Sequence, residues 1–421
     1  IPIRRGKGVW LEDFDGRQYL DAISSWWVNL FGHCHPYINQ AIRNQLEELD
    51  HVILAGFSHE PVIRLAERLV EKTPSELTRC FFADNGSSAI EIALKMSFHA
   101  WKNQGQIKKT KFVALENSYH GETLAALAVG GVQLYRDTYQ PLLIETLRVP
   151  SPDCFYANEN QTWEQYSLQQ FVHMEKLLAE RHEEIAAVIV EPLVQCAGSM
   201  RMYHPIYLTR LRQACDEYNV YLILDEIAVG FGRTGTLFAL EQADIYPDFL
   251  CLSKGITGGY LPLSVVMTTN AIYDIFYDDY SSLKAFLHSH SYTGNPLACT
   301  AANATLDLFE HENILEKNKE LIAYLSKKLT IFKHHPFVAD VRQTGMIAAI
   351  ELMQDGKRQP FPWQQRIGLT VYEHALSRGV LLRPLGSVIY FMPPYVISKS
   401  EIDLMCEVAL DGIAAATHYL R

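Results

Sequence analysis

The sequence predicts an α/β protein, with a mostly parallel sheet in a large domain and a smaller α+β domain in the C-terminal part of the chain. Short strands alternate with helical segments through the first two thirds of the chain, and these strands are apolar throughout. Strands of that kind are buried on both faces, as in parallel sheets covered by helices. A chain of 421 residues is long for one hydrophobic core, so two domains are expected.

The N-terminal segment predicts a hairpin followed by two helices. Residues 8–21 contain an Asp15-Gly16 turn between two strand-like runs, which is a strong local signal for a β-hairpin. Helical patterns cover 36–49 and 61–71, and each begins at a proline, a residue favoured in the first helical turn. Residues 33–35 (His-Cys-His) precede the first of these helices, and we expect a loop there because adjacent residues cannot easily supply three ligands to one metal ion.

Five apolar strands define the expected large domain. Helical segments such as 208–218 lie between them, and the carboxyl ends of parallel strands gather at one edge of the sheet, where ligands bind. The strands cover residues 80–83, 112–115, 187–190, 220–224 and 249–252.

From about residue 305 the pattern changes. A long helix over 305–333 and a second over 364–378 are expected, and Ser400 with Asp403 forms a capping-box pattern at the start of the last helix. Strand-like runs cover 338–341, 346–351, 379–384 and 388–392. The expected division is residues 46–305 for the large domain and 306–421 for the small domain, which residues 1–45 join.

Composition excludes several classes of function. Lys plus Arg is 37 and Asp plus Glu is 48, so the net charge of −11 argues against binding to nucleic acid or to an anionic membrane. No apolar run approaches the roughly 18 residues of a membrane span, and no signal peptide is visible. The eight cysteines form no C-x-x-C pair, which favours free thiols in a reducing cytoplasm.

Lys254 and Asp225 give the strongest functional signal. Asp225 ends the apolar run 220–224, and Lys254 comes just beyond the run 249–252. An enzyme that uses pyridoxal phosphate (PLP) requires a lysine that forms a Schiff base with the cofactor. It also requires a carboxylate that keeps the pyridinium nitrogen protonated, so that the ring accepts electrons.

A phosphate site is expected where residues 84–88 (Asp-Asn-Gly-Ser-Ser) follow a strand and open a helix. Gly86 and Ser87 offer backbone N–H groups, a hydroxyl and the positive end of the helix dipole. The alternative is that Ser87 or Ser88 merely caps the helix. With Lys254 and Asp225 on the same sheet, the phosphate interpretation is favoured.

Four further segments have more than one interpretation. Tyr119 follows a strand and is expected either to stack on a planar ring or to be a core aromatic residue. Glu191 also ends a strand and either pairs with a mobile arginine or is solvated. Residues 230–235 match a dinucleotide glycine pattern only superficially, because they do not open a helix after a strand. Residues 288–296 provide a second phosphate contact or form a capped loop.

Together these motifs resemble class III PLP-dependent aminotransferases of fold type I over essentially the whole chain. The resemblance is carried by Asp15-Gly16, Asn85-Gly86-Ser87-Ser88-Ala89, Tyr119-His120-Gly121, Glu191-Pro192, Leu224-Asp225-Glu226, residues 230–235, Ser253-Lys254-Gly255 and Thr293-Gly294-Asn295-Pro296. Within the class, the chain most resembles the branch that aminates 8-amino-7-oxononanoate in biotin synthesis, on the basis of residues 24–27, 198–205, 383–384 and 389–395.

The resemblance implies roles for individual residues. Lys254, Asp225 and Tyr119 are implied to be catalytic. Besides these three, the implied PLP ligands are Gly86 and Ser87, with His290 and Ser291 reaching across from the other subunit of a homodimer with shared sites. The implied substrate pocket contains Trp26, Tyr119, Lys254, Ser289 and Arg383. Glu122 departs from the aspartate that is usual after His-Gly in the class.

The implied activity is an amino transfer between small molecules. The expected reaction converts 8-amino-7-oxononanoate to 7,8-diaminononanoate with S-adenosylmethionine as the amino donor. Alternatives are the same reaction with lysine as donor, or another class III ω-aminotransferase acting on ornithine, GABA or a diamine. A non-catalytic PLP-binding protein is disfavoured because Lys254, Asp225 and the phosphate loop are intact.

Overall fold

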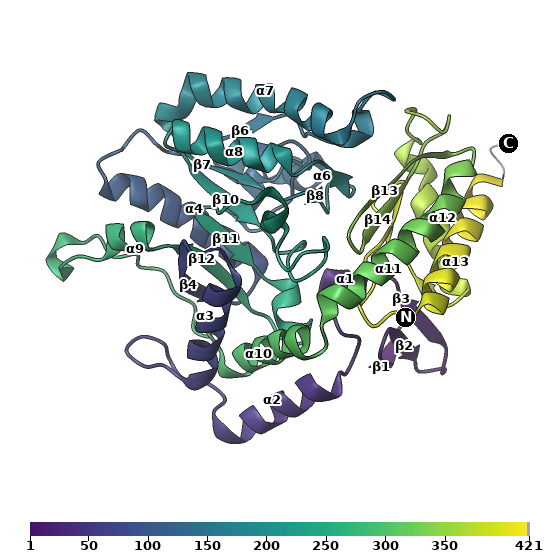
Figure 1. Ribbon diagram of the computed structural model, residues 1–421, viewed down its shortest axis with the longest axis horizontal. Helices are drawn as coiled ribbons and strands as arrows, with labels where there is room; N and C mark the ends of the chain where they lie inside the picture. Colours follow the sequence, from purple (N-terminus) through teal and green to yellow (C-terminus); the bar gives the residue numbers. More distant parts are fainter. Residues whose placement is uncertain (419–421) are drawn as a thin grey trace. The chain divides into compact units, whose positions relative to one another are not determined.

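In the computed structural model, which describes residues 1–418, the chain divides into two units (Figure 1). The sheet unit comprises Ile42–Phe231 and Phe238–Asn303. The C-terminal unit comprises Ile1–Ala41, Gly232–Leu237 and Ala304–Arg421. The N-terminal hairpin and the short segment Gly232–Leu237 therefore belong to the same unit as the C-terminal part of the chain.

The sheet unit is built on seven strands in the order β4-β12-β11-β10-β7-β5-β6. β12 pairs antiparallel with β11 and β4, and the remaining neighbours pair in parallel, which confirms the predicted mostly parallel α/β fold. The strands are β4 (Leu77–Ala83), β5 (Lys111–Leu115), β6 (Thr146–Val149), β7 (Ile185–Val190), β10 (Tyr221–Asp225), β11 (Phe249–Leu252) and β12 (Ser264–Thr269). A two-stranded ribbon, β8 (Val194–Gln195) with β9 (Arg201–Met202), follows β7.

Alternate residues of the central strands pack on opposite faces of the sheet. Ala187 and Ile189 of β7 and Ile223 of β10 join a hydrophobic cluster with helix α4 (Gly86–Asn103). Their neighbours Val188 and Leu222 are equally buried and face the other side, where α8 contacts both β10 and α7. Burial on both faces explains why these strands read as continuous apolar runs. The other helices here are α3 (Glu60–Lys72), α5 (Leu124–Val129), α6 (Gln133–Arg136), α7 (Trp163–Arg181), α8 (Ile206–Glu217) and α9 (Asn270–Phe276).

A buried lysine links three strand ends of this sheet. The Nζ of Lys109, just before β5, donates hydrogen bonds to the carbonyl oxygens of His182 (2.8 Å), Ile185 (3.2 Å) and Asn219 (2.8 Å). The same ammonium lies 4.7 Å from the ring centre of Trp101. These contacts join the amino-terminal ends of β5, β7 and β10.

The C-terminal unit contains two small sheets. The predicted hairpin, β2 (Trp10–Asp13) and β3 (Gln18–Asp21), is confirmed, with β1 (Ile3–Lys7) on one side and β15 (Val380–Leu381) on the other. The second sheet is antiparallel and consists of β13 (Val338–Thr344), β14 (Ile347–Leu352) and β16 (Val388–Phe391). Its helices are α11 (Ile314–Leu329), α12 (Ile367–Ser377) and α13 (Lys399–Thr417), while α2 (Pro36–Glu48) and α10 (Pro296–His311) cross the boundary between units. Among residues 1–418, no helix is long and apolar enough to cross a membrane.

Two local predictions for this part of the chain are wrong. The helix expected over 305–333 is two helices, because Asn313 adopts a left-handed backbone (φ 51°) between α10 and α11. The last helix is capped by Ser398 with Glu401, rather than by Ser400 with Asp403. Asp403 instead accepts a hydrogen bond from the Tyr324 hydroxyl, so its carboxylate is engaged with α11.

Candidate active site

Lys254 begins the turn directly after β11, at the carboxyl edge of the sheet. Its backbone is left-handed (φ 47°), a strained conformation for a residue with a side chain. Burial lowers the pKa of the Lys254 ammonium, and the charges of Asp225 and Glu191 oppose that shift. A lowered pKa leaves more of the lysine as the neutral amine, which is the nucleophilic form.

Asp225 ends the neighbouring strand β10 and is buried. Its Oδ2 lies 2.7 Å from Nδ1 of His120, and its Oδ1 accepts a hydrogen bond of 3.1 Å from the backbone N–H of Ile227. These contacts fix the plane of the carboxylate. The role of His120 is not evident from its place in the Tyr119-His120-Gly121 motif, since only the pairing of β5 and β10 with β7 brings the two residues together.

Glu191, at the end of β7, is a second buried carboxyl group. Its Oε2 accepts from the backbone N–H of Tyr119 (2.9 Å), and its Oε1 accepts from the backbone N–H of Cys196 (3.0 Å). Burial, and then the charge of Asp225, raises the pKa of Glu191 well above its usual value. The expectation that Glu191 is solvated is therefore wrong, because the sheet encloses it.

Tyr119 lies partly exposed at the same edge, so the alternative of an ordinary core aromatic is wrong. Its hydroxyl donates to Oε1 of Glu122 at 3.0 Å. Burial, the hydrogen bond to Glu122 and its charge all raise the pKa of the Tyr119 hydroxyl, which is therefore protonated at neutral pH. A phenol and a carboxylate thus form one polar wall of the site.

The start of α4 forms a close-packed cradle. Asn85 is the residue that caps this helix, accepting from the N–H of Ser88 at 3.0 Å, so the alternative of Ser87 or Ser88 as the cap is wrong. A Cβ on Gly86 would lie 3.0 Å from Ile227, and a Cβ on Gly121 would lie 2.1 Å from the Ser87 hydroxyl. Both glycines therefore keep open the space around the first turn of the helix.

The loop with Ser289, His290 and Ser291 does not contact this cradle through its hydrogen bonds. Nε2 of His288 lies 3.3 Å from Nε2 of His290, and Nζ of Lys95 lies 2.8 Å from Nδ1 of His288. Ser289 and Ser291 are exposed. Among the described residues of the sheet unit, the loop makes no hydrogen bond to Gly86 or Ser87.

The C-terminal unit brings Trp26 and Arg383 together. The guanidinium carbon of Arg383 lies 4.4 Å from the centre of the Trp26 ring. Trp26 is 53% exposed, and it belongs to the turn labelled α1 (Ser24–Trp27), whose four residues all have φ between 45° and 72°. This left-handed backbone is strained, so contacts with neighbouring residues are needed to hold the turn in place.

Asp21 is the main support of that turn. Its carboxylate accepts hydrogen bonds from the backbone N–H (2.9 Å) and the hydroxyl (2.7 Å) of Ser25, and it lies 3.0 Å from Nε2 of His33. Burial raises the pKa of Asp21, but the hydrogen bonds from His33 and Ser25 outweigh it and leave the pKa below its usual value. On the other side, the buried Arg233 donates to the carbonyl oxygen of Trp27 at 3.3 Å.

The fold and this set of residues define an aminotransferase. Residues 1–412 match the family of class-III aminotransferases, and the chain belongs to that family.

Relatives of known name agree with this assignment. Over 408 residues, 96% of this chain and 89% of the relative, the chain is 51% identical to the adenosylmethionine-8-amino-7-oxononanoate aminotransferase of Helicobacter pylori. The crystal structure of the Methanocaldococcus jannaschii enzyme of the same name is 38% identical, with a TM-score of 0.93 over 98% of this chain and 92% of that one. The ω-transaminase from Pseudomonas jessenii in complex with PMP is 28% identical, with a TM-score of 0.94 over 100% of this chain and 93% of that one.

The residues of the sheet unit fit PLP, the cofactor of this family. The cradle of Gly86, Ser87 and Gly121 leaves space at a helix N-terminus, which favours a phosphate group. The buried Asp225 suits a protonated ring nitrogen, and the lowered pKa of Lys254 suits bonding to an aldehyde.

Proposed function

We propose that the protein transfers an amino group to 8-amino-7-oxononanoate and so produces 7,8-diaminononanoate in biotin synthesis. The observation that carries this proposal is the Arg383–Trp26 pair, a guanidinium 4.4 Å from an exposed indole ring. The substrate has an apolar chain with a terminal carboxylate. The indole face of Trp26 suits the chain, and the guanidinium of Arg383 can bind the carboxylate through two hydrogen bonds. Relatives that bear the name of this reaction, at 38–51% identity, support the proposal.

We infer the roles of the sheet-unit residues from their contacts. When bound, PLP supplies a ring that withdraws electrons from the carbon bearing the amino group. Asp225, oriented by His120, holds a proton on the ring nitrogen. Nζ of Lys254 moves a proton between the substrate carbon that bears the amino group and the C4′ carbon of the cofactor. Gly86 and Ser87 bind the phosphate, while Tyr119 lines the face of the ring.

S-adenosylmethionine is the proposed amino donor. The carboxylate of Glu122, which accepts the hydrogen bond of Tyr119, provides a negative charge for this cationic molecule. Lysine also carries an extra positive charge and is the alternative donor. The ω-transaminase from Pseudomonas jessenii keeps open a second candidate function, another ω-amino transfer, because its fold agrees over the whole chain.

One experiment tests both the acceptor and the donor. Product formation from 8-amino-7-oxononanoate is measured with S-adenosylmethionine and with lysine side by side, together with a panel of ornithine, GABA and diamines. Efficient turnover with the first pair is expected. Faster turnover with lysine would make lysine the amino donor in place of S-adenosylmethionine. Turnover only with ornithine, GABA or diamines would overturn the proposed function.

The Arg383→Ala variant tests the role of the C-terminal unit. Losing a bidentate contact to the carboxylate is expected to weaken use of the keto acid roughly 10- to 100-fold. The half-reaction with the donor is expected to change far less, and stopped-flow spectra of the two half-reactions measure this difference. Equal damage to both half-reactions would mean that Arg383 is structural.

We also propose a cytoplasmic homodimer with shared active sites. Leu287 and Tyr292, on either side of His290 and Ser291, are 88% and 67% exposed, which is unusual for large apolar side chains beside a functional loop. A two-fold partner that covers them would carry His290, Ser291 and Ser289 to the neighbouring site. Free cysteines throughout the described chain support a reducing compartment.

A further inference from the structure

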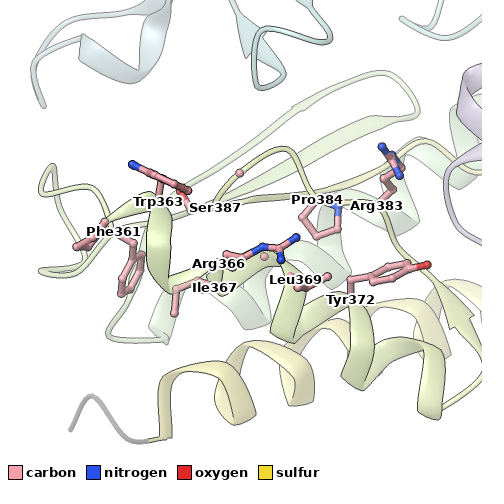
Figure 2. Close-up of a pocket in the computed structure, with 12 residues that line it drawn as sticks. Phe361, Trp363, Arg366, Ile367, Leu369, Tyr372, Arg383, Pro384 and Ser387 are labelled. Carbon is pink, nitrogen blue, oxygen red and sulfur yellow. The ribbon is translucent and has the colours of Figure 1, made fainter. Parts of the chain in front are cut away.

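A pocket of about 500 Å³ in the C-terminal unit has two arginines in its wall and no acidic residue among those that line it (Figure 2). Arg366 and Arg383 are both exposed. Within residues 1–418 neither guanidinium has an ion-pair partner, and Arg383 has only its contact with Trp26. Figure 2 shows Arg366 directed along the pocket toward Pro384, with Arg383 beyond that proline.

A glycine explains why the two arginines share this pocket. Gly368 lies in the first turn of α12, where a Cβ would be 2.1 Å from the carbonyl oxygen of Gly386 and 2.8 Å from Cβ of Pro384. The loop that follows Arg383 therefore rests directly on the helix that follows Arg366. Any larger side chain at position 368 would push the loop, and the pocket wall, away from the helix.

The N-terminus of helix α12, which begins just after Arg366, adds a further partial positive charge to the pocket. Arg366 is the residue before α12, its backbone is left-handed (φ 47°), and it makes no side-chain cap for the helix. The positive end of the α12 dipole therefore faces the same pocket as the two guanidinium groups. Three positive groups without a counter-ion repel one another and attract an anion. A left-handed arginine is also strained, and such strain is common at binding sites.

Most of the remaining wall is apolar. Phe361, Ile367, Leu369 and Tyr372 line the pocket beside Arg366, and Trp363 lies at its rim with 80% of its surface exposed. A volume of this size holds a small organic molecule. The pocket therefore combines a cationic group with a surface for methylene groups, which is the chemistry of an amphipathic carboxylate.

We propose that this pocket is a binding site for the carboxylate end of an apolar-chain carboxylic acid, and that Arg366 binds the carboxylate together with Arg383. The proposal rests on the proposed function in one respect, because the nine-carbon keto acid has such an end. It adds a second cation to the recognition of that acid.

The Arg366→Gln variant tests this inference in the whole enzyme. With 8-amino-7-oxononanoate, KM is expected to rise about 3- to 10-fold while kcat stays unchanged. With the methyl ester of the same acid, whose carboxyl end carries no charge, KM is expected to stay unchanged. Arg4→Gln, an exposed arginine of the same unit outside the pocket, is the matched control and is expected to change neither value. An unchanged KM for the acid, or an equal rise for acid and ester, would overturn the proposal.

Calorimetry with nonanoate separates this proposal from the proposed function. Nonanoate cannot be transaminated, so its binding does not depend on the reaction. Binding that weakens at least threefold in Arg366→Gln, but not in Arg4→Gln, supports the pocket even if wild-type protein fails to aminate the keto acid. Binding that is the same in both variants overturns the pocket, even if the amination proceeds.

Discussion

Asp225 and His120 are joined by a hydrogen bond of 2.7 Å inside the sheet unit, and single contacts of this kind set the chemistry of the site. Glu191 is enclosed nearby, with its pKa raised well above the usual value, whereas Lys254 is shifted toward its neutral form. Each shift follows from burial in the first place. The charge of Asp225 then raises the pKa of Glu191 further and opposes the lowering of the pKa of Lys254.

The His120→Ala variant is expected to bind PLP about tenfold more weakly and to transaminate more slowly, because Asp225 loses the hydrogen bond that fixes its plane. PLP titration by absorbance measures the affinity, and borohydride trapping followed by peptide mapping identifies the labelled lysine. The label is expected on Lys254 in both proteins. His173→Ala, an exposed histidine of α7, is the control. Labelling of another lysine would contradict the assignment of Lys254.

The sequence allowed prediction of Lys254 and Asp225 because each directly follows an apolar strand, and β10 and β11 are neighbours in the sheet. The role of His120 could not be predicted in this way. Its contact with Asp225 spans 105 positions and depends on the order of three strands. Arg366 gave no signal either, since its importance depends on the approach of the loop after Arg383 to Gly368.

At the scale of elements, the turn Ser24–Trp27 is the most unusual feature, since four consecutive residues keep a left-handed backbone. Such conformations persist only where surrounding contacts hold them. Asp21, His33 and Arg233 supply those contacts, and the turn presents Trp26 to Arg383. The geometry of the aromatic surface therefore depends on a buried carboxylate.

The Asp21→Asn variant is expected to lower the free energy of unfolding by about 1–3 kcal/mol at pH 7. The folded-state pKa of Asp21 lies below its unfolded value, so this stabilisation is present above the unfolded pKa of about 4 and is lost as the pH falls through the folded value. Urea unfolding of wild type and variant at pH 7, 5 and 3 measures the difference. It is expected to shrink at pH 3.

Asp15→Asn, in the exposed hairpin turn, is the control for that experiment and is expected to show no such dependence. A stability difference between wild type and Asp21→Asn that stays constant from pH 7 to pH 3 would contradict the role of the charged carboxylate.

Elements with continuous apolar patterns were predictable, and those that depend on context were not. β6 is a short strand at the edge of the sheet with alternating burial, and β12 follows a glycine-rich loop, so neither produced a clear pattern. The interruption at Asn313 was missed because the residues on both sides continue a helical pattern. A single left-handed residue is enough to end a helix, and its conformation depends on packing.

At the scale of the whole molecule, the proposed dimer makes a specific prediction. A Lys254→Ala protein and a His290→Ala/Ser291→Ala protein are each expected to be impaired. If His290 and Ser291 complete the partner's site, half of the randomly re-associated dimers are hybrids with one intact site each, so the mixture is expected to regain about a quarter of wild-type activity.

Activity of the mixed variants is measured after dissociation and re-association, with sedimentation to confirm the dimer. Each variant treated alone in the same way is the control. Recovery no greater than the average of the two separate variants would show that His290 and Ser291 act within their own subunit, and an active monomer would contradict the shared site.

The three hydrogen bonds of Lys109 also bear on the order in which the chain folds during its synthesis. The acceptors are carbonyl groups that lie 73, 76 and 110 positions further along the chain. While the ribosome is still making β7, the ammonium of Lys109 has no acceptor from Asn219 and must stay hydrated. The amino-terminal ends of β5, β7 and β10 can therefore be locked together only after Asn219 has left the exit tunnel, and the nascent sheet remains open at that edge until then.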